Sequence, residues 1–211
     1  MEWLQALLDM DGLFLVGTVS FTISGYLVGV RHKFDLLGVL IVALLTAIGG
    51  GIVRDMMLNR IPLVFHDGSA LYTIGVSLLA SRVFRLSRRK STTLYRLFVI
   101  TDSIGLVAFS LAGAEVAIHY GLNLFGVLAV SFISAVGGGI VRDMMVNEVP
   151  FILHRDFYGT VALVCGGALY LAAQFGWHGP ALQWSLFAAG LALRLFAHSR
   201  DLRLPQVEQP D

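Results

Sequence analysis

Apolar residues gather along the chain in seven long runs, separated by short segments that hold most of the charged residues. The runs are Leu13–Val30, Leu36–Leu58, Gly68–Phe84, Leu97–Tyr120, Leu124–Val146, Tyr158–Phe175 and Ala181–Ala197. A helix needs about 20 mostly apolar residues to cross about 30 Å of hydrocarbon. The pattern therefore predicts an all-α integral membrane protein with seven transmembrane helices.

The composition supports a membrane protein and argues against several other classes. Hydrophobic residues make up 56% of the 211 residues and charged residues 14%, with a mean hydropathy of +0.77. A soluble domain usually carries about 25% charged residues. A net charge of +1 does not indicate nucleic-acid binding. The sequence has no HExxH, GxSxG, P-loop or Cys/His cluster, so we expect no enzyme, no bound metal and no cofactor.

Lysine and arginine lie mainly in alternate connections between the runs. They occur at positions 31–33, at 82–96, at Arg155 and in the C-terminal segment, whereas residues 1–12, 121–123 and 176–180 contain none. Positive charge stays on the cytoplasmic side of a membrane. We therefore expect the N-terminus outside and the C-terminus in the cytoplasm.

The chain contains an internal duplication. Residues 12–62 align without gaps to residues 100–150 at an offset of 88, and the segment Gly49–Met57 recurs identically as Gly137–Met145. Each copy spans three runs, and three is odd, so the second copy should enter the membrane from the opposite side. We expect a first three-helix repeat at 1–96, an inverted second repeat at 97–176, a seventh helix at 177–199 and a cytoplasmic tail at 200–211.

A glycine triplet occurs at the same place in each repeat. The candidate kink positions are Gly49, Gly50, Gly51, Gly137, Gly138 and Gly139. Three successive glycines weaken a helix and permit a bend beside a polar path. The alternative is that small residues simply allow tight helix packing.

An Arg-Asp pair follows each triplet, namely Arg54 with Asp55 and Arg142 with Asp143. Charged residues inside a membrane span usually face a bundle interior or a water-filled cavity. Arg54 lies 18 residues after Leu36, about 27 Å along a helix, so the two pairs should lie near opposite faces of the membrane. Adjacent residues point about 100° apart, so we expect pairing across helices, in a gate or in a clamp of helix ends.

Other polar residues lie within the same runs and could line a path. They are Ser20, Ser24, Thr46, Asp102, Ser110, Glu115 and Ser134. Several hydroxyls could instead bond to backbone carbonyls of their own helix. Asp102 and Glu115 would give the path an acidic character that suits cations. Asp102 could also pair with the arginines of 82–96, and Glu115 could lie at the outer surface.

The doubled Gly-Gly-Gly-x-x-Arg-Asp motif with trailing Asn and Pro resembles the bacterial branch of the trimeric intracellular cation (TRIC) channel family, also called UPF0126 or the glycine transporter domain. The resemblance extends from about Leu13 to Ala197. It implies a homotrimer in the bacterial inner membrane, with a pore in each protomer lined by helices 1, 2, 4 and 5. It also implies that potassium and sodium pass, and that helices 2 and 5 are kinked at the glycines.

Two alternatives to a cation channel remain open at this point. A carrier for a small amino acid such as glycine would also fit inverted repeats with broken helices. A structural protein whose glycines only pack is the other alternative. In that case, replacing Arg54 or Arg142 would harm assembly but not transport.

Overall fold

The computed structural model describes residues 12–154 and 157–202. In these ranges the protein is helical throughout, without strands, which confirms the predicted all-α class. The helices are α2 (Gly12–Arg31), α3 (Leu36–Met57), α4 (Ser69–Val83), α5 (Ser91–His119), α6 (Leu124–Met145), α7 (Phe151–His154), α8 (Tyr158–Gln174) and α9 (Pro180–Ser199), with short 3-10 turns η1 (Leu63–Phe65) and η2 (Leu86–Arg88).

Each of the seven apolar runs forms a helix close to the expected bounds. Five of these helices, α2, α3, α5, α6 and α9, are long and apolar enough to cross a membrane. The other two are shorter, with 15 residues in α4 and 17 in α8. Among the described residues, five helices therefore meet the length and composition needed to span a membrane.

The start of α5 was placed too late by the sequence analysis. The helix begins at Ser91, six residues before the expected Leu97, and is 29 residues long. Its first two turns contain Thr92, Tyr95 and Arg96, so an apolar run cannot reveal them. A helix of this length extends about 44 Å, which exceeds the hydrocarbon thickness.

Equivalent side chains begin and end the corresponding helices of the two repeats. The Asp35 carboxylate accepts a hydrogen bond from the Gly38 amide (2.7 Å) before α3, and the Asn123 side chain accepts one from the Gly126 amide (2.9 Å) before α6. Such caps satisfy backbone donors of the first turn. Each helix is followed by an asparagine with a left-handed backbone conformation, Asn59 after α3 and Asn147 after α6.

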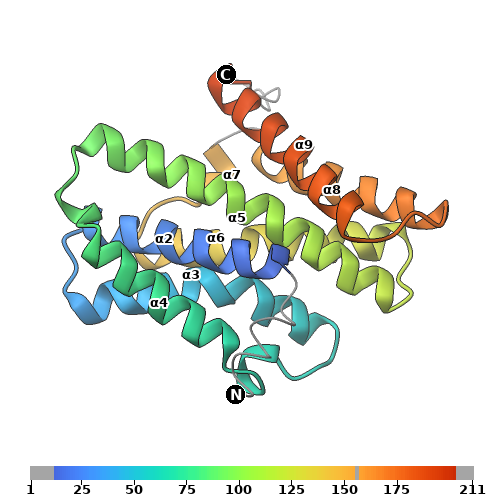
Figure 1. The fold of residues 1–211 in the computed structure, drawn as a ribbon, viewed down its shortest axis with the longest axis horizontal. Coiled ribbons are helices and arrows are strands. Elements are labelled where there is room, and N and C mark those ends of the chain that lie inside the picture. The colour runs from blue at the N-terminus through green and yellow to red at the C-terminus, as the bar shows by residue number, and fades with distance from the viewer. Residues whose placement is uncertain (1–11, 155–156, 203–211) are drawn as a thin grey trace, which may run out of the picture.

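The core consists of α2, α3, α5 and α6, which pack against one another as a four-helix arrangement. Figure 1 shows α5 running beside α2 along the length of the molecule, with α4 on one side and α8 and α9 on the other. We call the end where α2 begins and α3 ends the Arg54 end. The opposite end, where α5 begins and α6 ends, is the Arg142 end.

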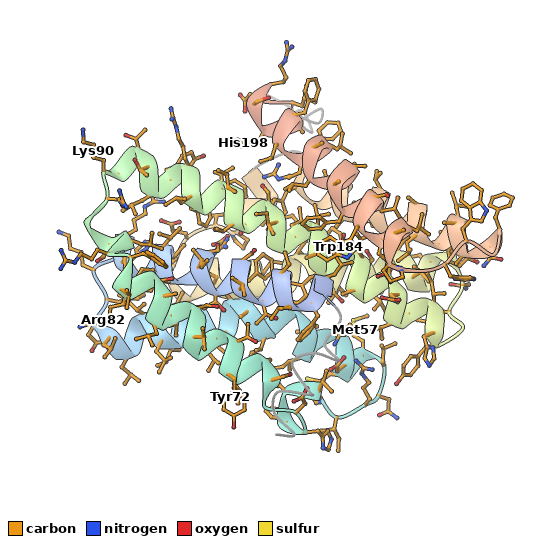
Figure 2. All side chains as sticks on the ribbon, viewed as in Figure 1. Met57, Tyr72, Arg82, Lys90, Trp184 and His198 are labelled. Atoms are coloured by element: carbon orange, nitrogen blue, oxygen red, sulfur yellow. The ribbon has the colours of Figure 1, made fainter. Side chains whose placement is uncertain are left out.

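Charged and apolar side chains are distributed as a membrane environment requires. Figure 2 shows Arg82 and Lys90 at the Arg142 end, where α4 ends and α5 begins, whereas Tyr72 projects from the side of α4. The outward faces of α3 and α4 expose large apolar side chains. The N-terminal segment, Arg155 and most of the expected tail lie outside the described residues.

Candidate functional site

The two glycine triplets lie where α3 and α6 cross, and they bring the two backbones into contact. A Cβ atom at Gly50 would overlap the carbonyl oxygen of Ser134, and one at Gly138 would overlap the carbonyl oxygen of Thr46. The two contacts are equivalent, because Gly138 and Ser134 lie 88 residues after Gly50 and Thr46. The later residue of one helix meets the earlier residue of the other, so the helices run antiparallel at the crossing. Glycine permits this approach because it has no side chain. Close packing is therefore one role of the triplets.

Both α3 and α6 continue as α-helix through their triplets. The triplets therefore do not interrupt the helical hydrogen bonding, and the broken helices considered in the sequence analysis do not occur here. A bend of the helix axis needs no interruption, so the pore kink stays a prediction.

An aromatic pair occupies the middle of the interface between α2 and α5. The rings of Phe21 and Phe109 have centroids 5.2 Å apart and are almost fully buried. Each ring packs on a glycine of the opposite helix, because Phe109 lies against Gly17 and Phe21 lies against Gly105. The two rings are also related by the offset of 88 residues. They fill the centre of the core with apolar atoms.

Arg142 is fully buried and holds three helices together. Its Nε donates to Asp143 Oδ1 (2.8 Å), and its Nη1 donates to the hydroxyl of Ser24 (2.7 Å) and to Asp102 Oδ1. Ser24 comes from α2, Asp102 from α5, and Asp143 from α6. We call these four residues the Arg142 cluster. Breaking a buried ion pair by removing one partner typically costs about 3–5 kcal/mol, since a buried charge is then left without compensation.

Aromatic residues cover the Arg142 cluster. The Arg142 guanidinium lies over the ring of Phe98, 4.8 Å from its centroid. The backbone amide of Phe151 donates to the second oxygen of Asp143 at 2.7 Å. The arrangement excludes water from the charges, which strengthens their attraction.

Arg54 occupies the equivalent position at the other end of the core. Its Nε donates to Asp55 Oδ1 (2.7 Å), and the other Asp55 oxygen accepts the Leu63 amide (3.0 Å). Arg60 adds two hydrogen bonds to Asp55 Oδ1, at 2.9 and 2.6 Å. Partial burial would lower the pKa of Arg60, but the hydrogen bond and charge of Asp55 outweigh it and raise that pKa. Arg60 therefore stays charged.

The expectation that each arginine pairs across helices rather than with its neighbour was wrong for Arg54 and incomplete for Arg142. Both arginines bond to the adjacent aspartate, and Arg142 also reaches α2 and α5. The long arginine side chain can fold back along the helix surface, so the angle between adjacent Cα–Cβ bonds does not prevent the pair. The expected placement at opposite ends fits the antiparallel crossing, which puts the arginines about 18 Å apart along the helix axes.

The two ends differ because two partners of Arg142 have no counterpart at Arg54. The residue equivalent to Asp102 is Phe14, and the residue equivalent to Ser24 is Ala112. Without these polar partners, Arg54 lines a cavity of about 760 Å³ that also includes Phe14 and Ala112. The equivalent space at the Arg142 end contains the ion cluster.

The cavity at the Arg54 end has a mixed polar lining. It contains Asp67, Glu115, His119 and Gln183, in addition to the two arginines. Glu115 accepts a hydrogen bond from the Gln183 side chain. The lining of this cavity therefore contains both acidic and basic side chains.

A second cavity, of about 650 Å³, lies at the Arg142 end. It is lined by the last turns of α2, including Leu27 and Arg31, and by the first turns of α5, including Phe98. Phe14 in one cavity and Leu27 in the other are 13 residues apart on α2, which corresponds to about 20 Å. Buried side chains fill the stretch of core between them.

The candidate hydroxyls are buried in this stretch, and most bond to their own helix. Thr46, Ser110 and Ser134 donate to backbone carbonyls three or four residues earlier, at 2.6–2.8 Å. Ser20 is buried in α2. Asp102 pairs with Arg142 rather than with the arginines of 82–96. Glu115 is exposed and lines the cavity at the Arg54 end.

The sequence analysis did not identify several residues of the site. Phe21 and Phe109 could have been found, because they are identical residues at the offset of 88. Phe98, Phe151 and Arg60 gave no comparable signal, since their importance depends on packing around the charges. In the described part of the chain, no group of three or more His, Cys, Asp or Glu residues could hold a metal ion.

Comparison with protein families and curated proteins places this chain among bacterial membrane proteins. The family described as "Glycine transporter" matches residues 12–88 and 99–174. A UPF0126 membrane protein of Deinococcus radiodurans is 40% identical over 164 residues, which are 75% of this chain and 74% of that protein. The UPF0126 inner membrane protein YadS of Escherichia coli is 32% identical over 195 residues, which are 90% and 92% of the two chains.

Solved structures with the same fold are described as channels. A structure from work on conductance through TRIC cation channels has a TM-score of 0.81 and 32% identity, covering 96% of this chain and 99% of the other. A TRIC trimeric intracellular cation channel orthologue from Rhodobacter sphaeroides has a TM-score of 0.80 and 31% identity, covering 90% and 97%. These neighbours are channels, not enzymes.

Proposed function

Because this chain belongs to the family of the UPF0126 membrane proteins and TRIC cation channels, we propose that it is a potassium-permeable channel for monovalent cations. One observation carries the proposal. Two cavities open at opposite ends of the α2, α3, α5 and α6 core, and a closed stretch of about 20 Å that contains polar side chains separates them. A channel needs a continuous wet path, and the two cavities support the proposal as its entrances.

The proposed path runs within one protomer, and three such protomers assemble as a homotrimer in the bacterial inner membrane. All seven helices, including the shorter α4 and α8, cross the bilayer as two inverted three-helix repeats plus α9. The antiparallel contact of the glycine triplets supports this layout, because equivalent atoms of the two copies face one another there. The basic residues at the Arg142 end support a cytoplasmic location for that end.

The arrangement described above corresponds to a closed channel. The ion pairs of the Arg142 cluster close the proposed cytoplasmic end, and Phe21 and Phe109 close the centre. Opening would require the cluster to exchange its internal hydrogen bonds for water. Cations would enter from outside through the larger cavity, whose lining includes the acidic residues Glu115 and Asp67.

A carrier for a small amino acid is the second candidate, and one feature of the outer cavity favours it. Arg60 lies at the wall of this cavity with 30% of its side chain exposed and could bind a carboxylate, while Glu115 or Asp67 could bind an ammonium group. The cavity volume argues against glycine as the occupant. About 760 Å³ is in the range of pockets for drug-sized ligands, so glycine would be poorly enclosed.

Proteoliposomes that contain the purified protein would separate the two candidates. Potassium efflux down a gradient and uptake of labelled glycine would be measured on the same preparation, with empty liposomes as the control. Potassium efflux without saturable glycine uptake is the expected result. Saturable glycine uptake without ion leak would refute the channel and assign the outer cavity to substrate binding.

A further inference from the structure

Arg194 is a buried arginine on the seventh helix, outside the duplication. The structure describes α9 throughout, and within it only Gly190, Arg194 and Ala197 are buried. Arg194 is 1% exposed, although most of the helix faces outward. A charged side chain buried at this depth in a membrane protein is costly, and such residues usually act in a specific interaction.

The guanidinium of Arg194 packs on two aromatic rings. It lies 4.8 Å from the ring centroid of Tyr158 and 5.8 Å from that of Phe151. The two rings meet edge to face, with centroids 5.6 Å apart. Contacts of this kind between a cation and a ring are strongest where water is excluded.

The same two rings also lie beside Arg142 and Asp143 of the Arg142 cluster. The Phe151 amide donates to Asp143, and the Phe151 ring meets the ring of Phe98 edge to face, with centroids 5.9 Å apart. Phe98 in turn lies beneath Arg142. Three aromatic rings therefore lie one after another in one stack, with Arg194 at one end and Arg142 at the other.

The first repeat has no equivalent of this stack. The residue corresponding to Phe151 is Leu63, and the residue corresponding to Tyr158 is Ala70. No helix of the duplication corresponds to α9. Both arginines are buried, but only Arg54 lies beside the larger cavity, whereas the equivalent space beside Arg142 contains the ion cluster.

We propose that Arg194 is a positioning residue for the channel gate: it holds Phe151 and Tyr158 against the Arg142 cluster, so that the seventh helix stabilises the closed state. The interpretation of the cluster as a gate rests on the proposed function, whereas the mechanical coupling between α9 and the cluster does not.

The test measures the cluster and the ion flux separately. Arg194→Met keeps an unbranched apolar stem and removes the guanidinium group with its charge. Hydrogen exchange at the Phe151 amide, followed by mass spectrometry on protein in lipid nanodiscs, should become about tenfold faster, and potassium flux should rise by a similar factor. The matched control is Arg200→Met. The Arg200 guanidinium lies over the ring of Phe196 on the same helix, 5.5 Å from its centroid, but outside the stack, so neither quantity should change.

Phe151→Leu keeps the proposal testable if Arg194→Met folds poorly, and a double variant tests the coupling directly. Phe151→Leu places in the second repeat the residue that the first repeat already has, and it should raise both exchange and flux. In a background of Asp102→Asn, Arg194→Met should add nothing to the flux, because the cluster is already weakened.

Each outcome has a defined meaning. Unchanged exchange at the Phe151 amide in a folded Arg194→Met protein would overturn the coupling. Additive flux effects in the Asp102→Asn background would also overturn it, since Arg194 would then act elsewhere. Faster exchange without potassium flux in any variant, including the wild type, would support the coupling and refute the channel.

Discussion

The contact between the glycine triplets predicts different effects for neighbouring glycines of the same helix. A Cβ atom at Gly138 would overlap the Thr46 carbonyl oxygen and lie 3.1 Å from its carbon. Carbon atoms in good contact are about 3.5–4.0 Å apart, so relief of the carbon contact alone would separate α3 and α6 by about 0.5–1 Å, and the nearer oxygen requires more. In Gly51→Ala, by contrast, the nearest atom is the Arg54 Nη2, at 3.9 Å.

We expect Gly138→Ala to lower the free energy of unfolding by about 1–3 kcal/mol, the usual cost of overpacking a core. In a chain of this size, the midpoint of thermal unfolding should fall by about 2–12 °C. Gly51→Ala should leave the midpoint unchanged or raise it slightly, because alanine favours helix by up to about 1 kcal/mol over glycine. The measurement is thermal unfolding in detergent, followed by the loss of the folded peak in size-exclusion chromatography.

The double variant Gly50→Ala with Gly138→Ala tests whether one interface is involved. A single separation of α3 and α6 would relieve both overlaps, so the double variant should cost less than the sum of the single variants. Equal midpoints for Gly138→Ala and Gly51→Ala would refute the packing argument. Strict additivity of the two overlapping positions would mean that they do not share one contact.

Three further substitutions follow from the charged groups. Asp102→Asn should increase resting potassium flux, because Arg142 loses the negative charge that pairs with it on α5, and an unchanged flux in a folded protein would remove the cluster from gating. Glu115→Gln should lower the permeability of cations relative to anions, measured as the reversal potential in a salt gradient, and no shift would exclude this residue from the path. Phe14→Asp combined with Ala112→Ser gives the Arg54 end the partners found at the other end, and should reduce flux. An unreduced flux would mean that the polar partners of Arg142 are not what closes its end of the core.

The family, the helices and the duplication could be predicted from the sequence because they depend on local pattern. Seven apolar runs, two identical glycine triplets and trailing Asn and Pro residues need no knowledge of tertiary contacts. The helix caps at Asp35 and Asn123 are local in the same sense. The exception was the start of α5, where polar residues continue the helix beyond its apolar part.

The site was decided by tertiary structure, because its chemistry depends on which side chains meet across helices. The sequence presents Arg54-Asp55 and Arg142-Asp143 as equivalent, and only the fold places Asp102 beside one arginine and Phe14 beside the other. Arg194 gave no repeat signal, since the seventh helix has no second copy. Repetition in the sequence determined the common framework of the two halves, whereas long-range packing gave Arg142 partners on three helices and left a cavity beside Arg54.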